Sequence, residues 1–160
     1  MELFSASLNS PLGPIVLKAT QTDLVELNFE AINPRGLHSN SLLEEATAQL
    51  QAYFAGKLQS FSIPIKPEGT PFERDIWKRL QEIPFATTLS YTDFSIHHPK
   101  AIRAIASANG KNKIPILIPC HRVIGKNGNL VGYSGGIWRK KWLLDHENEI
   151  APKGQTRLKL

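Results

Sequence analysis

Residues 114–123 form an apolar run that contains two prolines and ends with Cys120, His121, Arg122 and Val123. Cys120 is the only cysteine in the chain of 160 residues, so an internal disulfide is impossible and a cysteine-rich zinc site is not expected. A thiol reacts as the thiolate, and nearby cationic groups favour that form. The run therefore predicts a single nucleophile on a rigid backbone, in a protein of a reducing compartment.

Charge is distributed unevenly along the chain. Residues 1–69 contain four Lys or Arg and seven Asp or Glu, a balance of −3, whereas residues 70–160 contain fifteen and seven, a balance of +8. No acidic residue occurs between Asp93 and Asp145. Such a basic region is typical either of a solvated surface or of a site for a polyanion, most often nucleic acid.

No apolar run is long enough to span a bilayer. The first residues also lack the basic and apolar regions of a secretory signal. We therefore expect a cytoplasmic protein with no membrane partner.

The first part of the chain has the pattern of an α/β domain. Residues 3–8, 14–19 and 24–29 predict three short strands of an antiparallel sheet, separated by turn residues. A helix is expected from Ser41, which has capping-box spacing to Glu44. Residues 57–69 are expected to be a linker, and we place the first domain at residues 1–66.

The second part is expected to be mainly helical. Thr70 and Glu73 have capping-box spacing around a helix that begins at Pro71. The remaining elements are a strand or turn with a short helix in 88–96, a helix in 99–110, a tight turn at 125–129 that could form a wing, and a last helix near 137–147. A short helix, a turn and a basic helix make a helix-turn-helix arrangement. We expect a winged-helix DNA-binding domain over 67–150 and a short basic tail over 151–160.

The helix at 99–110 has one face with two cations and two small residues, Lys100, Arg103, Ala104 and Ser107. Such a face can approach a phosphate backbone or a groove closely. The alternative is an alanine-rich core helix whose charges are merely solvated.

Several motifs resemble the O6-alkylguanine-DNA alkyltransferases, also called methylated-DNA–protein-cysteine methyltransferases. They are the IPCHRV string at 118–123, Asn112, the YSGG string at 133–136 and the WLLDHE string at 142–147. The likeness is strongest over 70–147 and weak before residue 40. It implies a small ribonuclease-H-like α/β domain followed by a winged-helix domain.

The resemblance also implies an activity. A protein of this family moves an alkyl group from O6 of guanine in duplex DNA to its own cysteine, irreversibly and once per molecule, without a cofactor. We expect a monomer whose partner is double-stranded DNA. It would lie near the nucleoid in a bacterium or archaeon, and in the nucleus in a eukaryote.

By this resemblance, Cys120 accepts the alkyl group and His121 takes the thiol proton through a water. Glu147 orients the imidazole of His121, which gives the logic of a catalytic triad with one extra link. Tyr91 reaches the base and donates its hydroxyl. If residues 120 and 121 lie on a strand, their side chains point to opposite faces.

The resemblance assigns four further residues to substrate binding. The backbone N–H of Ser134 contacts O6, the carbonyls of Cys120 and Val123 accept from the guanine amino group, and Tyr133 forms a wall of the pocket. Asn112 ties the recognition helix to the active-site turn.

Guanine O6 cannot react inside a stacked duplex, so the nucleotide must be flipped out. Arg103 matches the family's arginine that fills the vacated space. Lys100 and Arg122 are expected either to contact phosphate or to act through local electrostatics. One departure from the family is Ala86, which stands where glycine is frequent.

Three other functions remain open at this point. The chain could be a module that senses alkylated DNA without transferring the group, although relatives of that kind lack the cysteine. It could be a cysteine hydrolase, although direct adjacency of Cys120 and His121 suits a dyad poorly. It could be a winged-helix transcription factor, whose sequence-specific binding would survive Cys120→Ser.

Overall fold

The computed structural model describes residues 2–130, 132, 133 and 135–151. The chain divides into two compact units, Met1–Glu68 and Gly69–Leu160. Ser134 and all but the first residue of the expected basic tail lie outside the described residues. Within the described part of the chain, no helix has both the length and the apolar character needed to cross a membrane.

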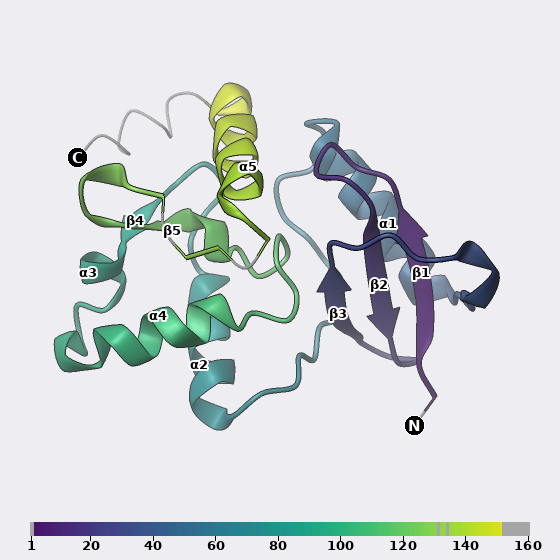
Figure 1. The fold of residues 1–160 in the computed structure, drawn as a ribbon, viewed down its shortest axis with the longest axis horizontal. Coiled ribbons are helices and arrows are strands. Elements are labelled where there is room, and N and C mark those ends of the chain that lie inside the picture. The colour runs from purple at the N-terminus through teal and green to yellow at the C-terminus, as the bar shows by residue number, and fades with distance from the viewer. Residues whose placement is uncertain (1, 131, 134, 152–160) are drawn as a thin grey trace. The chain divides into compact units, whose positions relative to one another are not determined.

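The first unit is an antiparallel sheet with one long helix. Strands β1 (Phe4–Leu8), β2 (Ile15–Ala19) and β3 (Leu24–Asn28) pair in the order β1-β2-β3. Four of the five residues of β2, the central strand, are buried. Helix α1 (Ser41–Phe54) packs against β1 and β2 and covers one face of the sheet (Figure 1). A short 3-10 helix, η1 (Pro34–Gly36), precedes α1.

Two details of this unit differ from the sequence expectations. The cap of α1 is Asn40 rather than Ser41, because the Asn40 side chain accepts a hydrogen bond from the N–H of Leu43. The linker is also not free of structure: Ile65 forms a parallel bridge with Leu24, the first residue of β3. Backbone pairing of a proline-rich segment with a sheet edge leaves no periodic signal in the sequence.

The second unit is mainly helical. Its longer helices are α2 (Pro71–Leu80), α4 (Ile102–Gly110) and α5 (Ile137–Ile150). The capping box between Thr70 and Glu73 is present as expected. The shorter elements are β4 (Leu89–Ser90), α3 (Tyr91–Phe94), η2 (Pro99–Ala101), η3 (Cys120–Arg122), β5 (Val123–Ile124) and η4 (Lys126–Gly128).

Helices α2 and α4 pack against each other (Figure 1). Buried Trp77 of α2 donates a hydrogen bond from Nε1 to the carbonyl oxygen of Ala108 in α4 at 2.8 Å. Gly69 lies under the same indole ring, where a Cβ would come within 2.5 Å of Cη2 of Trp77. The C-terminal end of α4 is therefore anchored to α2 by packing and by a buried hydrogen bond.

The cysteine segment is not a strand. Cys120, His121 and Arg122 form the single turn of η3, and β5 begins only at Val123. β5 pairs in parallel with β4, with Leu89 opposite Val123 and Ser90 opposite Ile124, so the start of β4 lies beside the end of this turn. A 3-10 turn rotates successive side chains by roughly a third of a circle. The expectation that Cys120 and His121 point to opposite faces assumed a strand, and it therefore does not apply to this turn.

Candidate active site

The backbone before Cys120 is a tight turn held by Asn112. Nδ2 of Asn112 donates to the carbonyl oxygen of Ile118 at 2.7 Å, and its Oδ1 accepts from the N–H of Ile114 at 2.9 Å. Ile116, between these two residues, is buried with φ of 79°, a left-handed conformation that a β-branched residue rarely adopts. One side chain thus joins both ends of a strained turn, and the turn fixes where η3 begins.

Cys120 is buried, with 3% of its surface exposed. Burial raises the pKa of its thiol to about 11, and the hydrogen bond from Asn112 and the nearby charge of Lys140 offset that increase only in part. The basic sequence around Cys120 therefore does not produce a resting thiolate, contrary to the sequence expectation. Desolvation outweighs the cations, so reaction requires a base that removes the proton.

Glu147 of α5 is the centre of a buried polar network. Its Oε2 lies 2.8 Å from Nε2 of His121 and 2.9 Å from Nη2 of Arg122. Its Oε1 accepts from Nε of Arg122 at 2.9 Å and from the N–H of Ala86 at 3.0 Å. Burial alone would raise the pKa of Glu147, but His121 and Arg122 outweigh burial and hold this pKa well below its usual range. Glu147 is a carboxylate.

The protonation of His121 follows from this contact. Burial lowers the pKa of His121, and Arg122 and Lys140 act in the same direction, although Glu147 opposes them. A neutral imidazole beside a carboxylate donates from Nε2, so Nδ1 carries the lone pair. Nδ1 is buried and has no hydrogen-bond partner among the described residues. His121 therefore has its acceptor nitrogen available as a base.

Ala86 makes its hydrogen bond to Glu147 at a conformational cost. Its φ is 61°, and a side chain with a Cβ is strained in this region. The turn thus keeps a left-handed backbone at the position where glycine is frequent in the resembled family. The strained residue is the one whose backbone N–H donates to the carboxylate of Glu147.

Arg122 lies inside the unit. It is 7% exposed, forms a two-pronged ion pair with Glu147, and donates from Nη1 to the carbonyl oxygen of Ile83 at 2.8 Å. This placement leaves no guanidinium face for DNA and corrects the expectation of a phosphate contact. The other expectation for Arg122, a local electrostatic role, agrees with this geometry.

Lys140 is a functional candidate that the sequence reasoning missed. It lies on α5, is fully buried, and donates from Nζ to the carbonyl oxygen of Val123 at 2.7 Å. Burial lowers the pKa of Lys140 to about 8, and Cys120 acts in the opposite direction. The sequence did contain a signal for its burial: Lys140, Leu143 and Glu147 have the i, i+3, i+7 spacing of residues on one helix face.

Two tyrosines lie near the thiol. Tyr91 opens α3, half-buried, and its hydroxyl oxygen accepts a hydrogen bond from Nδ2 of Asn109. Burial raises the pKa of Tyr91; the bond from Asn109 lowers it, and Cys120 raises it further. Tyr133 is buried, its hydroxyl has no partner among the described residues, and its pKa is well above the usual value because of burial and of Cys120. Both phenols are neutral, so each can donate.

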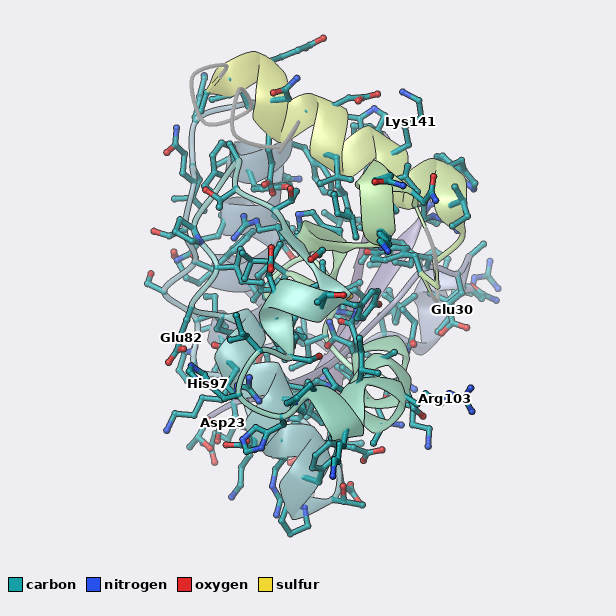
Figure 2. The ribbon with its side chains drawn as sticks, turned by 90° about the vertical axis from the view of Figure 1, so that its left-hand side faces the viewer. Asp23, Glu30, Glu82, His97, Arg103 and Lys141 are labelled. Carbon is teal, nitrogen blue, oxygen red and sulfur yellow. The ribbon has the colours of Figure 1, made fainter. Side chains whose placement is uncertain are left out.

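The expected face of α4 is exposed. Arg103, Ala104 and Ser107 of α4 lie at the surface, as does Lys100 of the preceding η2, while Ile105, Ala108 and Asn109 are buried on the other side of α4. Figure 2 shows the Arg103 side chain extending outward from its helix. The alternative of a core helix therefore fits only the opposite face.

The structure brings Cys120, His121, Glu147 and Asn112 into one site, together with Arg122 and Lys140. The carbonyl oxygen of Val123 is at this site and already accepts from Lys140, which leaves its second lone pair for another donor. Within the described ranges, no group of three or more His, Cys, Asp or Glu side chains is placed to hold a metal ion.

Family models match both units. A model described as "6-O-methylguanine DNA methyltransferase, ribonuclease-like domain" matches residues 3–67. A model described as "6-O-methylguanine DNA methyltransferase, DNA binding domain" matches residues 71–149.

Curated relatives resemble the chain over most of its length. A constitutive methylated-DNA–protein-cysteine methyltransferase of Bacillus subtilis is 50% identical over 161 residues, covering 94% of this chain and 98% of the relative. The methylated-DNA–protein-cysteine methyltransferase of Methanosarcina acetivorans is 40% identical over 153 residues, covering 91% of this chain and 98% of the relative.

Solved structures have the same fold. The O6-methylguanine methyltransferase of Mycobacterium tuberculosis has a TM-score of 0.83 and 37% identity, covering 98% of this chain and 99% of that one. A structure of Mycobacterium tuberculosis OGT in complex with DNA has a TM-score of 0.81 and 37% identity, covering 96% and 98%. These comparisons confirm the expected fold class, a ribonuclease-like α/β domain followed by a DNA-binding domain.

Proposed function

Because the chain belongs to the 6-O-methylguanine DNA methyltransferase family, we propose that it repairs DNA by transferring a methyl group from O6 of guanine to its own Cys120. The single observation that carries the proposal is the contact of 2.8 Å between Nε2 of His121 and Oε2 of Glu147. This contact leaves Nδ1 available as an acceptor on the residue that directly follows the buried thiol. A thiol whose pKa is about 11 needs such a base.

The first step is removal of the thiol proton. Nδ1 of His121 takes the proton of Cys120 through a bridging water, which the resemblance implies, and becomes imidazolium. Glu147 stabilises this cation by accepting from Nε2. Lys140 stabilises the thiolate that forms, because its charge lowers the pKa of Cys120.

In the second step the thiolate attacks the methyl carbon. A C–S bond forms, and the bond between that carbon and O6 of guanine breaks with its electron pair on the base. Tyr91 and the N–H of Ser134 donate to the guanine as its negative charge develops. The restored guanine takes a ring proton from solvent, and the imidazolium of His121 releases the former thiol proton to solvent, so the protons balance. The thioether has no leaving group, so each molecule acts once.

The exposed face of α4 is the DNA-binding surface in this proposal. Lys100 contacts phosphate, and Ala104 and Ser107 allow close approach because they are small. Arg103 enters the space that the flipped nucleotide leaves, and Tyr133 forms a wall of the pocket that receives it. The thiol must stay reduced to act, so we place the protein in the cytoplasm, working as a monomer.

The alternative functions predict different outcomes from this one. A sensor of alkylated DNA needs neither a nucleophile nor a base beside it, yet His121 and Glu147 are both buried at the thiol. A cysteine hydrolase would turn over an ester or amide repeatedly.

The experiment measures how much guanine is restored. The protein is mixed with an excess of a duplex oligonucleotide that contains O6-methylguanine, and the nucleosides are quantified after digestion. The proposal requires one equivalent of guanine per protein molecule, followed by no further reaction, and none with Cys120→Ala. Restoration of many equivalents would indicate a catalyst that regenerates its thiol, and none with the unaltered chain would indicate a sensor; either result would overturn the proposal.

A further inference from the structure

We propose that Asn109 is a positioning residue that holds the Tyr91 hydroxyl so that its proton points at the bound guanine. This inference rests on the proposed function, since it assigns the orientation of a donor used in the same reaction. Nothing in the sequence pattern distinguishes Asn109 from the other residues of its helix, whereas its hydrogen bonds in the structure do.

Asn109 lies on the buried side of α4, near its C-terminal end, and is 3% exposed. The preceding residue is fixed in place, because the carbonyl oxygen of Ala108 accepts the buried hydrogen bond from Nε1 of Trp77 at 2.8 Å. Asn109 itself accepts from the backbone N–H of Asn112. The backbone of Asn109 is therefore held from two directions, and its side chain starts from a rigid position.

The side chain of Asn109 donates from Nδ2 to the hydroxyl oxygen of Tyr91. A phenol oxygen that already accepts one hydrogen bond must direct its own O–H elsewhere. Tyr91 is close enough to Cys120 for the charge of the sulfur to affect its titration. The O–H that is directed away from Asn109 is therefore free to donate to another acceptor, which the proposed function makes the guanine.

The second observation is the other half of the amide. Oδ1 of Asn109 is buried and has no hydrogen-bond partner among the described residues. An unpaired buried acceptor is costly, and protein interiors rarely retain one without a reason. If the amide only filled space, an apolar side chain would serve without that cost. The unpaired Oδ1 is explained if the amide must be oriented with Nδ2 toward Tyr91.

The bond has a chemical effect as well as a geometric one. Donation from Nδ2 stabilises the partial negative charge that builds up on the phenol oxygen as the hydrogen bond from Tyr91 to the guanine strengthens. An acceptor at position 109 would do the reverse, because it would take the Tyr91 hydrogen bond for itself. The direction of donation therefore distinguishes asparagine from a carboxylate of nearly the same shape.

The test is a double-mutant cycle with Tyr91→Phe, measured as the single-turnover rate of methyl transfer from an O6-methylguanine duplex at saturating protein. Asn109→Leu keeps the volume and removes the donor, Asn109→Asp replaces the donor with an acceptor, and Asn109→Ser is the smaller variant that avoids strain. We expect Asn109→Leu and Asn109→Ser to lower the rate about tenfold, the effect of one lost hydrogen bond, and Asn109→Asp to lower it further.

The decisive readout is the effect of Tyr91→Phe in each background. If Asn109 acts through Tyr91, then Tyr91→Phe slows the unaltered protein but changes the rate of Asn109→Leu or Asn109→Ser by less than about twofold. Equal losses from Tyr91→Phe in all backgrounds, or a wild-type rate for both Asn109→Leu and Asn109→Ser, would overturn the inference. A structural role alone would shift thermal unfolding without this dependence.

Ser95→Ala is the matched control. The Oγ of Ser95 is also buried without a partner among the described residues, and Ser95 follows α3 directly. Its removal should leave the transfer rate unchanged. If the unaltered protein transfers no methyl group, the proposed function fails; if it does and the cycle is additive, only the role of Asn109 fails.

Discussion

Nζ of Lys140 donates a hydrogen bond to the carbonyl oxygen of Val123 across 2.7 Å, and no part of the Lys140 side chain reaches the surface. A buried ammonium is costly. Here it lies close enough to Cys120 to lower the pKa of the thiol. The arrangement places a cation, a nucleophile and a base within one buried site.

Lys140→Met is therefore expected to slow methyl transfer at least about tenfold, the effect of one unit in the pKa of the thiol. The free energy of unfolding should stay the same or rise, because a buried charge is removed. The pKa of Lys140 is lowered from 10.5 to about 8, so the unfolded chain binds more protons between these values. The unaltered protein should gain stability relative to Lys140→Met as pH rises through that interval. Single-turnover rates and denaturant unfolding at several pH values test both statements, and an unchanged rate would contradict the role of Lys140.

The resting state of Cys120 gives a second prediction. The ultraviolet absorbance of the thiolate should appear with a midpoint of about 11 in the folded protein. Burial is the cause, so the same titration in denaturant should move toward the ordinary value for cysteine. The same titration of Cys120→Ser gives the absorbance change due to tyrosine, which is subtracted. A midpoint below the ordinary cysteine value would mean that the thiol is ionised at rest and needs no base.

Removal of the Glu147 charge should affect stability as well as rate. Glu147→Gln leaves Arg122 buried without its carboxylate and should cost about 3 to 5 kcal/mol of unfolding free energy. The control is Asp145→Asn on the same helix, where an exposed ion pair of 2.6 Å with Lys141 should contribute less than about 1 kcal/mol. Because the pKa of Glu147 is lowered from 4.5, the stability that its carboxylate contributes is fully present above pH 4.5 and is lost as the pH falls below that value. Similar losses for the two variants would contradict the buried network.

The sequence predicted the helix that begins after Thr70, since a capping box and an apolar period are local signals. It also predicted which face of α4 would be exposed. It did not predict the burial of Arg122 and Lys140, because each lies in a basic stretch whose charges suggest a surface. Only the tertiary contact with Glu147 shows that Arg122 is internal. The cap at Asn40 was missed for a simpler reason: Ser41 and Glu44 offered an equally good capping box one residue later.

Arg103→Ala tests the proposed DNA-binding face. We expect the loss of rate on duplex to be at least about tenfold larger than on a single-stranded oligonucleotide with the same lesion, because only the duplex must be unstacked. Arg35→Ala, which removes an exposed arginine from the first unit, is the control and should affect neither substrate. Equal losses on duplex and single strand would mean that Arg103 contributes charge alone.

The central claim is that the sulfur of Cys120 keeps the alkyl group. Its most direct test is the mass of the intact protein after reaction with an excess of O6-methylguanine duplex, followed by peptide mapping. We predict a gain equal to one methyl group in place of one hydrogen, located on the peptide that contains Cys120, and no second addition at longer times. An unchanged mass, or a methyl group on any other residue, would contradict the account.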